Sequence, residues 1–267
     1  MNLLILGDIV GISGRNVVKN NLKSIIDAHN IDFVVANGEN AADDGKGITK
    51  QVAEELFSFG IDVLTSGNHI WDKKDVIGYI DKNDRLLRPA NFVAGSPGKG
   101  FGIYLSKKKK YKIGVINLIG NVFMKKSDDV FKTANELKSK LQLKKNVDFL
   151  VIDFHGEITS EKMAMGHFFD GVSTVVIGTH THIPTADTRI LKNGTAYQTD
   201  IGMCGDYDSV IGMNKENSIK RFLRDKNAIS NFPAKGEASI SGIFIEGNEK
   251  NGLADNVRRI VKGGSLE

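Results

Sequence analysis

The chain has 267 residues, of which 40% are hydrophobic and 25% charged, a composition typical of a soluble globular protein with a sizeable core. Its formal net charge of +4 suits anionic substrates such as nucleotides, but it is too weak to indicate nucleic-acid binding by itself. A single cysteine, Cys204, excludes an intrachain disulfide and favours a reducing compartment. No apolar run approaches the roughly 18 residues of a membrane span. We therefore expect one cytoplasmic domain over residues 1–267.

Apolar runs alternate with helical spacings in the first third of the chain. Strands are expected at 3–6, 33–36 and 61–64, and helices at 16–28 and 51–59. Thr49 is placed to cap the second helix. This alternation of strands and helices predicts a largely parallel sheet.

After Pro89 the pattern changes to strands joined by short turns. The expected strands are 91–93, 102–105 and 112–118, with the lysine run 107–110 as a solvated hairpin tip rather than a phosphate-binding patch. The later elements expected are helices at 130–143 and 161–169 and strands at 147–154, 174–177, 189–191, 196–199 and 238–245. The hairpins and late strands predict a second sheet packed on the first.

The most informative segment is Gly-Thr-His-Thr-His at 178–182, which directly follows the apolar run 175–177. In an extended chain, residues i and i+2 point to the same side, so His180 and His182 can converge on one point or on two points a few Å apart. Neutral imidazole is a common ligand for zinc, manganese and iron. The segment therefore predicts a metal site.

Four other motifs place side chains that can bind metals just past the ends of apolar strands. They are Gly7-Asp8, Gly38-Glu39-Asn40, Gly67-Asn68-His69 and His155-Gly156. Each motif alone is also consistent with a turn, a helix cap or a loop. Taken together they predict one site, because ligands of open α/β sheets bind outside the carboxyl ends of the strands.

The number of candidate ligands indicates two metal ions. Three histidines, two carboxylates and the asparagines exceed what one ion needs if it must keep an open position. A carboxylate such as Glu39 can bridge two ions about 3.5–4 Å apart, which can then clamp a phosphate ester. Nitrogen and oxygen ligands without a thiolate favour manganese, iron or zinc over calcium.

These motifs resemble, in order, the five signature blocks of the calcineurin-like metallophosphoesterases. Over nearly the whole chain the sequence is similar to the YmdB-type branch, in the strings 37–40, 66–69 with Trp71-Asp72, 178–184 with Ala186-Asp187, and 194–197. Two positions depart from the broad superfamily. Val10 stands where a histidine is usual, and Glu39 where the bridging residue is usually aspartate. The branch shares both changes, with Asn40 as a substitute ligand.

The resemblance implies a four-layer α/β/β/α sandwich with two mixed sheets, within the α/β class. It implies one metal held by Asp8, Glu39, Asn40 and His182, and another held by Glu39, Asn68, His155 and His180. Iron or manganese is favoured, with zinc as an alternative. His69 would stay unliganded, face the substrate and donate a proton or stabilise charge on the phosphate.

The resemblance also implies a phosphodiesterase that hydrolyses 2′,3′-cyclic or 3′,5′-cyclic nucleotides through attack of a metal-bridging hydroxide. A phosphomonoesterase, a nucleotidase, a nuclease and a non-catalytic regulatory scaffold stay open as alternatives, although the intact ligand set and His69 argue against the scaffold. RNA ends are a further candidate substrate, and a homo-oligomer is expected. Asp72 and Asp187 either orient ligand histidines or are simple loop carboxylates.

Overall fold

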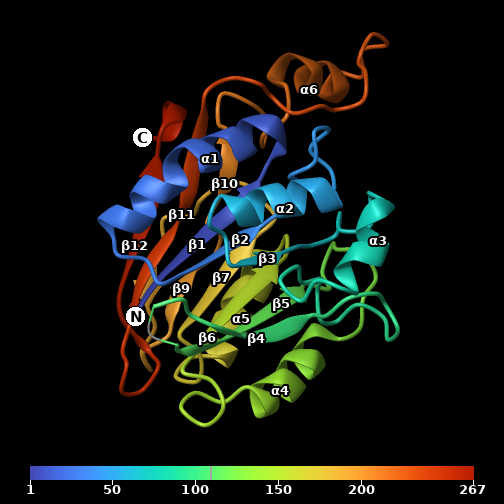
Figure 1. The fold of residues 1–267 in the computed structure, drawn as a ribbon. Coiled ribbons are helices and arrows are strands. Elements are labelled where there is room, and N and C mark those ends of the chain that lie inside the picture. The colour runs from blue at the N-terminus through green and yellow to red at the C-terminus, as the bar shows by residue number, and fades with distance from the viewer. Residues whose placement is uncertain (109) are drawn as a thin grey trace.

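The computed structural model describes every residue of the chain except Lys109. Its centre is formed by two six-stranded sheets (Figure 1). The first has the order β12-β11-β10-β1-β2-β3, and the second has the order β4-β5-β6-β7-β9-β8. Both sheets mix parallel and antiparallel pairs, so the expected α/β class with two mixed sheets is confirmed.

The strands of the first sheet are β1 (Asn2–Ile9), β2 (Phe33–Asn37), β3 (Val63–Thr65), β10 (Met203–Asp206), β11 (Ala238–Gly247) and β12 (Ala254–Lys262). Those of the second are β4 (Phe101–Leu105), β5 (Lys112–Ile119), β6 (Phe149–His155), β7 (Val175–Thr179), β8 (Arg189–Ile190) and β9 (Ala196–Gln198). The helices are α1 (Gly11–Ala28), α2 (Lys50–Ser58), α3 (Asp75–Ile80), α4 (Val130–Lys140), α5 (Thr159–Phe168) and α6 (Lys215–Phe222), with a 3-10 turn at Gly264–Leu266.

The alternation of side chains along the buried strands builds four layers. On β1, Leu3 points into a core between the two sheets, whereas Leu4 packs with residues of α1 and α2 on the outer side. On β6, Val151 joins the core between the sheets, whereas Leu150 packs with residues of α4 and α5. The order helix, sheet, sheet, helix is visible in Figure 1, where α1 and α2 lie opposite α4. Among the described helices, none has both the length and the apolar character that a membrane span needs.

The carboxyl ends of parallel strands from both sheets meet at one edge of the sandwich. β1, β2 and β3 are parallel neighbours in the first sheet, as are β5, β6 and β7 in the second. Side chains bond directly between the sheets at this edge, where Asn37 at the end of β2 donates to Asp153 of β6 over 3.1 Å. The fold therefore brings the strand ends that carry the candidate ligands to a common place.

Several elements differ from those that the sequence predicts. The strand expected at 91–93 is wrong, because the Asn91 side chain bonds the backbone N–H and C=O of Ile119 and replaces a backbone ladder. The first helix begins at Gly11, where a φ of 59° lets the chain turn out of β1. The expected cap of α2 is confirmed, since Thr49 accepts from the Val52 N–H.

The sequence does not predict β10, β12, α3 and α6, which are short or polar segments without a clear apolar period. In the lysine run at the β4–β5 hairpin, Lys107 is exposed and pairs with Asp62 over 2.9 Å. Lys109 lies outside the described residues.

Candidate metal centre

Asp8 lies inside β1, not beyond its end, and it is fully buried. Its Oδ2 accepts from the His180 N–H over 3.2 Å, whereas Oδ1 has no hydrogen-bond partner in the part of the chain that the structure describes. Burial raises the pKa of Asp8 to about 6, a shift that nearby His182 and His155 only partly oppose. A buried carboxylate oxygen without a partner is costly, so this arrangement fits an oxygen atom that receives a cation.

Asn40 and His182 face Asp8 with two further lone pairs. His182 Nδ1 lies 2.8 Å from the Ile211 carbonyl, so this nitrogen carries the proton and Nε2 is left as an acceptor. The Asn40 amide NH₂ donates to the Gly45 carbonyl over 2.9 Å, which turns Asn40 Oδ1 toward His182 Nε2 at 3.3 Å. Asp8 Oδ1 lies 4.0 Å from the same nitrogen. Asp8 Oδ1, Asn40 Oδ1 and His182 Nε2 are all acceptors, and no proton lies between them. Their convergence therefore fits a cation site.

A second group of atoms that could bind a metal surrounds His155 at the end of β6. Its Nε2 lies 2.9 Å from Glu39 Oε1, 3.2 Å from Asn68 Oδ1 and 3.0 Å from His180 Nδ1. Ligand atoms of Glu39, His155 and His180 all lie within 4.8 Å of one another. One imidazole nitrogen cannot donate to three such neighbours, so the geometry fits a second cation among them.

Burial and the short distances between Glu39, His155 and His180 shift the pKa of each of these residues. Burial opposes the charge on Glu39, but the attraction of His155 and donation from the His69 N–H outweigh it and lower the pKa of Glu39 to about 2. Burial likewise opposes charge on His155, but the attraction of Glu39 and Asp8 raises its pKa to about 9. Burial and the repulsion from His155 lower the pKa of His180 to about 3. His180 is therefore neutral and able to act as a ligand.

A buried polar network beneath His155 fixes the orientation of its ring, with Nδ1 as a donor. The Thr179 hydroxyl donates to Asp153 over 2.7 Å, so it can only accept from His155 Nδ1 at 2.9 Å. Asp153 also accepts from Thr65 Oγ1 and from Asn37. Its carboxylate thus links both sheets and leaves His155 Nε2 turned toward Glu39. Second-layer contacts of this kind hold metal-binding histidines in place.

The backbone at His180 and His182 is not extended as the sequence reading expects. Their φ angles are 100° and 67°, in the left-handed region, and both follow the end of β7. The two imidazoles therefore diverge toward different partners, which matches the alternative of two points rather than one. The expectation of an extended segment is wrong, because the chain turns sharply after Thr179.

A buried ion pair holds Thr181, the residue between the two histidines. Asp200 Oδ2 accepts from the Thr181 N–H at 3.1 Å, from its hydroxyl at 2.7 Å and from Lys162 Nζ at 2.7 Å. Asp200 Oδ1 accepts from the Gly202 N–H over 2.9 Å. Both charged side chains are only 1% exposed. This contact fixes the strained loop and, through it, both imidazoles.

His69 lies at the mouth of the site and is oriented by Asp72. Its Nδ1 is 2.7 Å from Asp72 Oδ2, so Nε2 points away from that carboxylate. Asp187 has a different role, since it accepts from the hydroxyls of Thr185 and Thr199 and, among the described residues, bonds no histidine. For Asp72, the contact supports the alternative that it orients a histidine rather than being a simple loop carboxylate. That histidine is His69, which is expected to bind no metal.

Several residues that support the centre were missed from the sequence. Asp153 interrupts an apolar strand two residues before His155, which is a signal that could have been found. Glu157, whose carboxylate lies 3.3 Å from His180 Nε2, is also close in sequence to a candidate ligand. Lys162 and Asp200 carry no comparable signal, because their pairing arises only from the tertiary fold.

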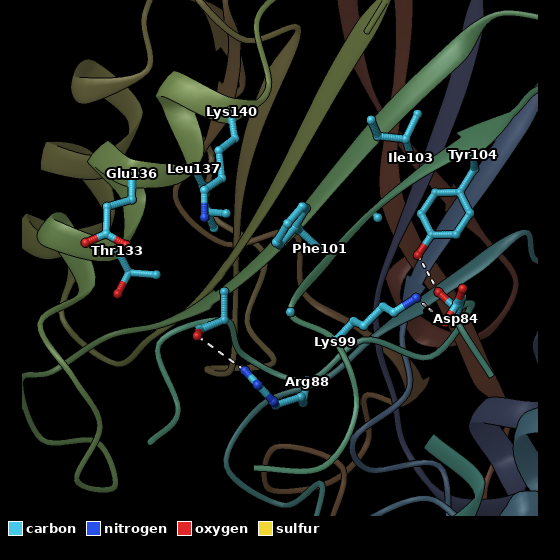
Figure 2. Close-up of a pocket in the computed structure, with 13 residues that line it drawn as sticks. Asp84, Arg88, Lys99, Phe101, Ile103, Tyr104, Thr133, Glu136, Leu137 and Lys140 are labelled. Atoms are coloured by element: carbon cyan, nitrogen blue, oxygen red, sulfur yellow. Dashed lines mark hydrogen bonds and ion pairs between the residues drawn. The ribbon is translucent and has the colours of Figure 1, made fainter. Parts of the chain in front are cut away.

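Four of the candidate ligands, Glu39, Asn40, His180 and His182, line a cleft of about 310 Å³ together with residues of the segment that contains α6. A larger cavity of about 640 Å³ lies between β4 and α4, away from them (Figure 2). Its charged groups are largely engaged within the protein, since Arg88 bonds the Pro89 carbonyl at 2.7 Å and Lys99 pairs with Asp84 at 2.7 Å. None of the candidate ligands lines this larger cavity.

Comparisons with known proteins agree with this architecture. A 2′,3′-cyclic-nucleotide 2′-phosphodiesterase from Bacillus subtilis (strain 168) is 42% identical over 98% of this chain and 97% of its own length. The crystal structure of a novel phosphatase from Mycoplasma pneumoniae superposes with a TM-score of 0.90 and 35% identity, over 98% of this chain and 93% of that one. A 5′-nucleotidase from Candida albicans is 13% identical, with a TM-score of 0.56 over 97% of this chain and 51% of that one, and it shows the fold alone.

The family model described as YmdB-like protein matches residues 4–260, which is nearly the whole chain. The matched range includes all of the candidate ligands, from Asp8 on β1 to His182 after β7. The expected four-layer architecture and the family resemblance are thus both confirmed. The chain belongs to the YmdB-like family, within the metallophosphoesterase fold.

Proposed function

We propose that this chain is a two-metal phosphodiesterase that opens the cyclic phosphate of 2′,3′-cyclic nucleotides. The observation that carries the proposal is the convergence of two groups of lone pairs from both sheets, next to the unpartnered buried oxygen Asp8 Oδ1. The activity for which the Bacillus subtilis relative is named supports the substrate class. Because the ligands come from both sheets, residues 1–267 would act as one catalytic domain.

The proposed ligands divide into two sets that share Glu39. One set is Asp8, Glu39, Asn40 and His182, and the other is Glu39, Asn68, His155 and His180. Two bound ions would neutralise the phosphate charge and polarise its phosphorus–oxygen bonds. Nitrogen and oxygen donors without thiolate favour manganese or iron, with zinc as the alternative.

His69 is proposed to protonate the leaving oxygen. Asp72 accepts from Nδ1 and orients the ring, so Nε2 is the atom that can donate a proton. In the balanced reaction, water gives its OH group to phosphorus and its remaining proton replaces the one that His69 donates, while the bond from phosphorus to the 2′-oxygen breaks. The 2′-oxygen takes the proton, and the product is a nucleoside 3′-phosphate. The chain's part is mainly to position the phosphate and neutralise its charge.

A phosphomonoesterase is a second candidate, because the similar Mycoplasma pneumoniae protein is described as a phosphatase. The ligand set itself does not separate monoesters from diesters. RNA-end substrates, a homo-oligomeric state and a cytoplasmic location stay predictions from the sequence.

The test combines elemental analysis of the purified protein with hydrolysis assays before and after chelation. We expect about two transition-metal ions per chain. We also expect hydrolysis of adenosine 2′,3′-cyclic phosphate that stops on chelation and returns with manganese or iron. A protein that stays inactive on cyclic nucleotides but hydrolyses nucleoside monophosphates would favour the phosphomonoesterase. Inactivity on both after metal is restored would refute a catalytic role.

A further inference from the structure

The cleft above the candidate ligands has a wall that the catalytic proposal does not use. After β10 the chain leaves the sheets, forms α6, and returns through residues 223–237 to β11. We call residues 207–237 the α6 lobe. In Figure 1 it stands at the top of the molecule, beyond the ends of β1 and β2. The lobe contributes Ile211, Met213, Arg221, Ser230 and Asn231 to the cleft that is also lined by His69 and by four of the proposed metal ligands.

Asn217, a buried residue of α6, holds this wall in a fixed shape. Its amide NH₂ donates to the carbonyls of Ile229 at 3.1 Å and Ser230 at 3.4 Å, and to Asn231 Oδ1 at 3.3 Å. Its Oδ1 accepts from the Ile229 N–H over 3.0 Å. The return segment is thus tied to the helix, and Ser230 and Asn231 are positioned before a ligand arrives.

The chemistry of the wall suits a flat group with hydrogen-bonding edges. Within the described chain, the Arg221 guanidinium has no carboxylate partner and bonds only the Ile229 carbonyl, at 3.2 Å. A planar guanidinium can stack on a base or bond its acceptors. Because Asn231 Oδ1 is engaged by Asn217, its NH₂ group is left to donate. Ser230 adds a hydroxyl that can donate or accept.

We propose that Arg221, Ser230 and Asn231 bind the nucleoside part of the substrate while the phosphate lies against the ligands opposite. The inference rests on the proposed phosphodiesterase function and deepens it. It makes the α6 lobe the element that distinguishes a nucleoside cyclic phosphate from a cyclic phosphate that has no base. Arg221 is then a specificity residue, separate from the groups that act on phosphorus.

The test compares adenosine 2′,3′-cyclic phosphate with glycerol 1,2-cyclic phosphate, which has the same five-membered phosphate ring but no nucleoside. In Arg221→Ala, KM for the nucleotide should rise about tenfold, the scale of one charge-assisted hydrogen bond, and in Asn231→Ala it should rise about two- to tenfold, the scale of a neutral one. The kinetic constants for the glycerol compound should stay within about twofold. Lys220→Ala is the matched control. It removes a positive charge from the neighbouring position of α6, outside the cleft, and should change neither substrate.

The inference would be overturned if Arg221→Ala changed the kinetic constants equally for both substrates. The residue would then bind the phosphate or stabilise the fold. An unchanged KM for the nucleotide would overturn it as well. If the wild type hydrolyses neither substrate, the proposed function fails, and calorimetric titration with adenosine 3′-monophosphate and with inorganic phosphate decides the inference. The inference would be supported if the wild type binds adenosine 3′-monophosphate more tightly than inorganic phosphate and Arg221→Ala binds the two equally. Equal binding of the two would refute it.

Discussion

The buried pair of Lys162 and Asp200 gives the sharpest prediction about what holds the candidate centre together. Each side chain is 1% exposed, and their charged atoms are 2.7 Å apart. The two residues are not equally supported, however. Asp200 also accepts three bonds, two from Thr181 and one from Gly202, whereas Lys162 has only Asp200 as its carboxylate partner among the described residues.

This asymmetry sets the expected magnitudes. Asp200→Asn leaves the Lys162 ammonium buried without a counter-charge, which should cost about 3–5 kcal/mol of unfolding free energy. Lys162→Met leaves a carboxylate that keeps its other three donors, so its cost should be smaller, about 1–3 kcal/mol. In the double variant neither charge is left uncompensated, so its loss should fall below the sum of the single losses by about 2 kcal/mol.

The assay is urea denaturation of the metal-free proteins, followed by metal titration of each folded variant. Because Asp200 fixes Thr181 between His180 and His182, Asp200→Asn should also bind metal more weakly than Lys162→Met. If Asp200→Asn does not fold, Lys162→Met and the double variant still supply the comparison. Additive losses, or a larger loss in Lys162→Met, would refute the reasoning.

Three further predictions follow from the site and the core. Glu39→Gln should abolish hydrolysis and leave fewer than two ions bound, because the shared ligand loses its charge. Elemental analysis and turnover measurements check this prediction, and turnover at the wild-type rate would contradict it. His69→Ala should keep both ions but slow turnover by roughly 10²–10⁴-fold, and lost metal in that variant would make His69 a ligand. Burial raises the pKa of Cys204 to about 12, so the native thiol should resist iodoacetamide near neutral pH and react only in denaturant. Prompt labelling of the native protein would contradict its burial.

The buried parts of the fold could be predicted from the sequence because their apolar runs are strong. The runs at 33–36 and 112–118 mark β2 and β5 almost to the residue. β12 was missed because it lies at a sheet edge and most of its side chains are exposed, so it lacks an apolar period. The strand expected at 91–93 shows the converse, since a short apolar segment can pack through the Asn91 side chain without joining a sheet.

The candidate ligands could be found because each belongs to a short motif next to a strand end. The backbone conformation that orients these side chains could not be predicted in the same way. The left-handed turns at His180 and His182 depend on the tertiary contact between Thr181 and Asp200, which no local spacing encodes. The α6 lobe was likewise hidden, because its order comes from Asn217, a residue type that is also common in ordinary loops.

The pairing of β1 has a consequence for the time at which this centre can form. The first half of β1 pairs with β11, where Asn2 lies opposite Glu246, and its last residues pair with β10, where Asp8 lies opposite Met203. Asp8 also lies opposite Asn37 of β2, so its strand partners are complete only when β10 is present as well. Contacts between such distant segments slow folding. During synthesis, a nascent chain that has not yet released β10 and β11 from the ribosome cannot assemble the complete ligand set, so catalytic competence should be among the last properties that the protein acquires.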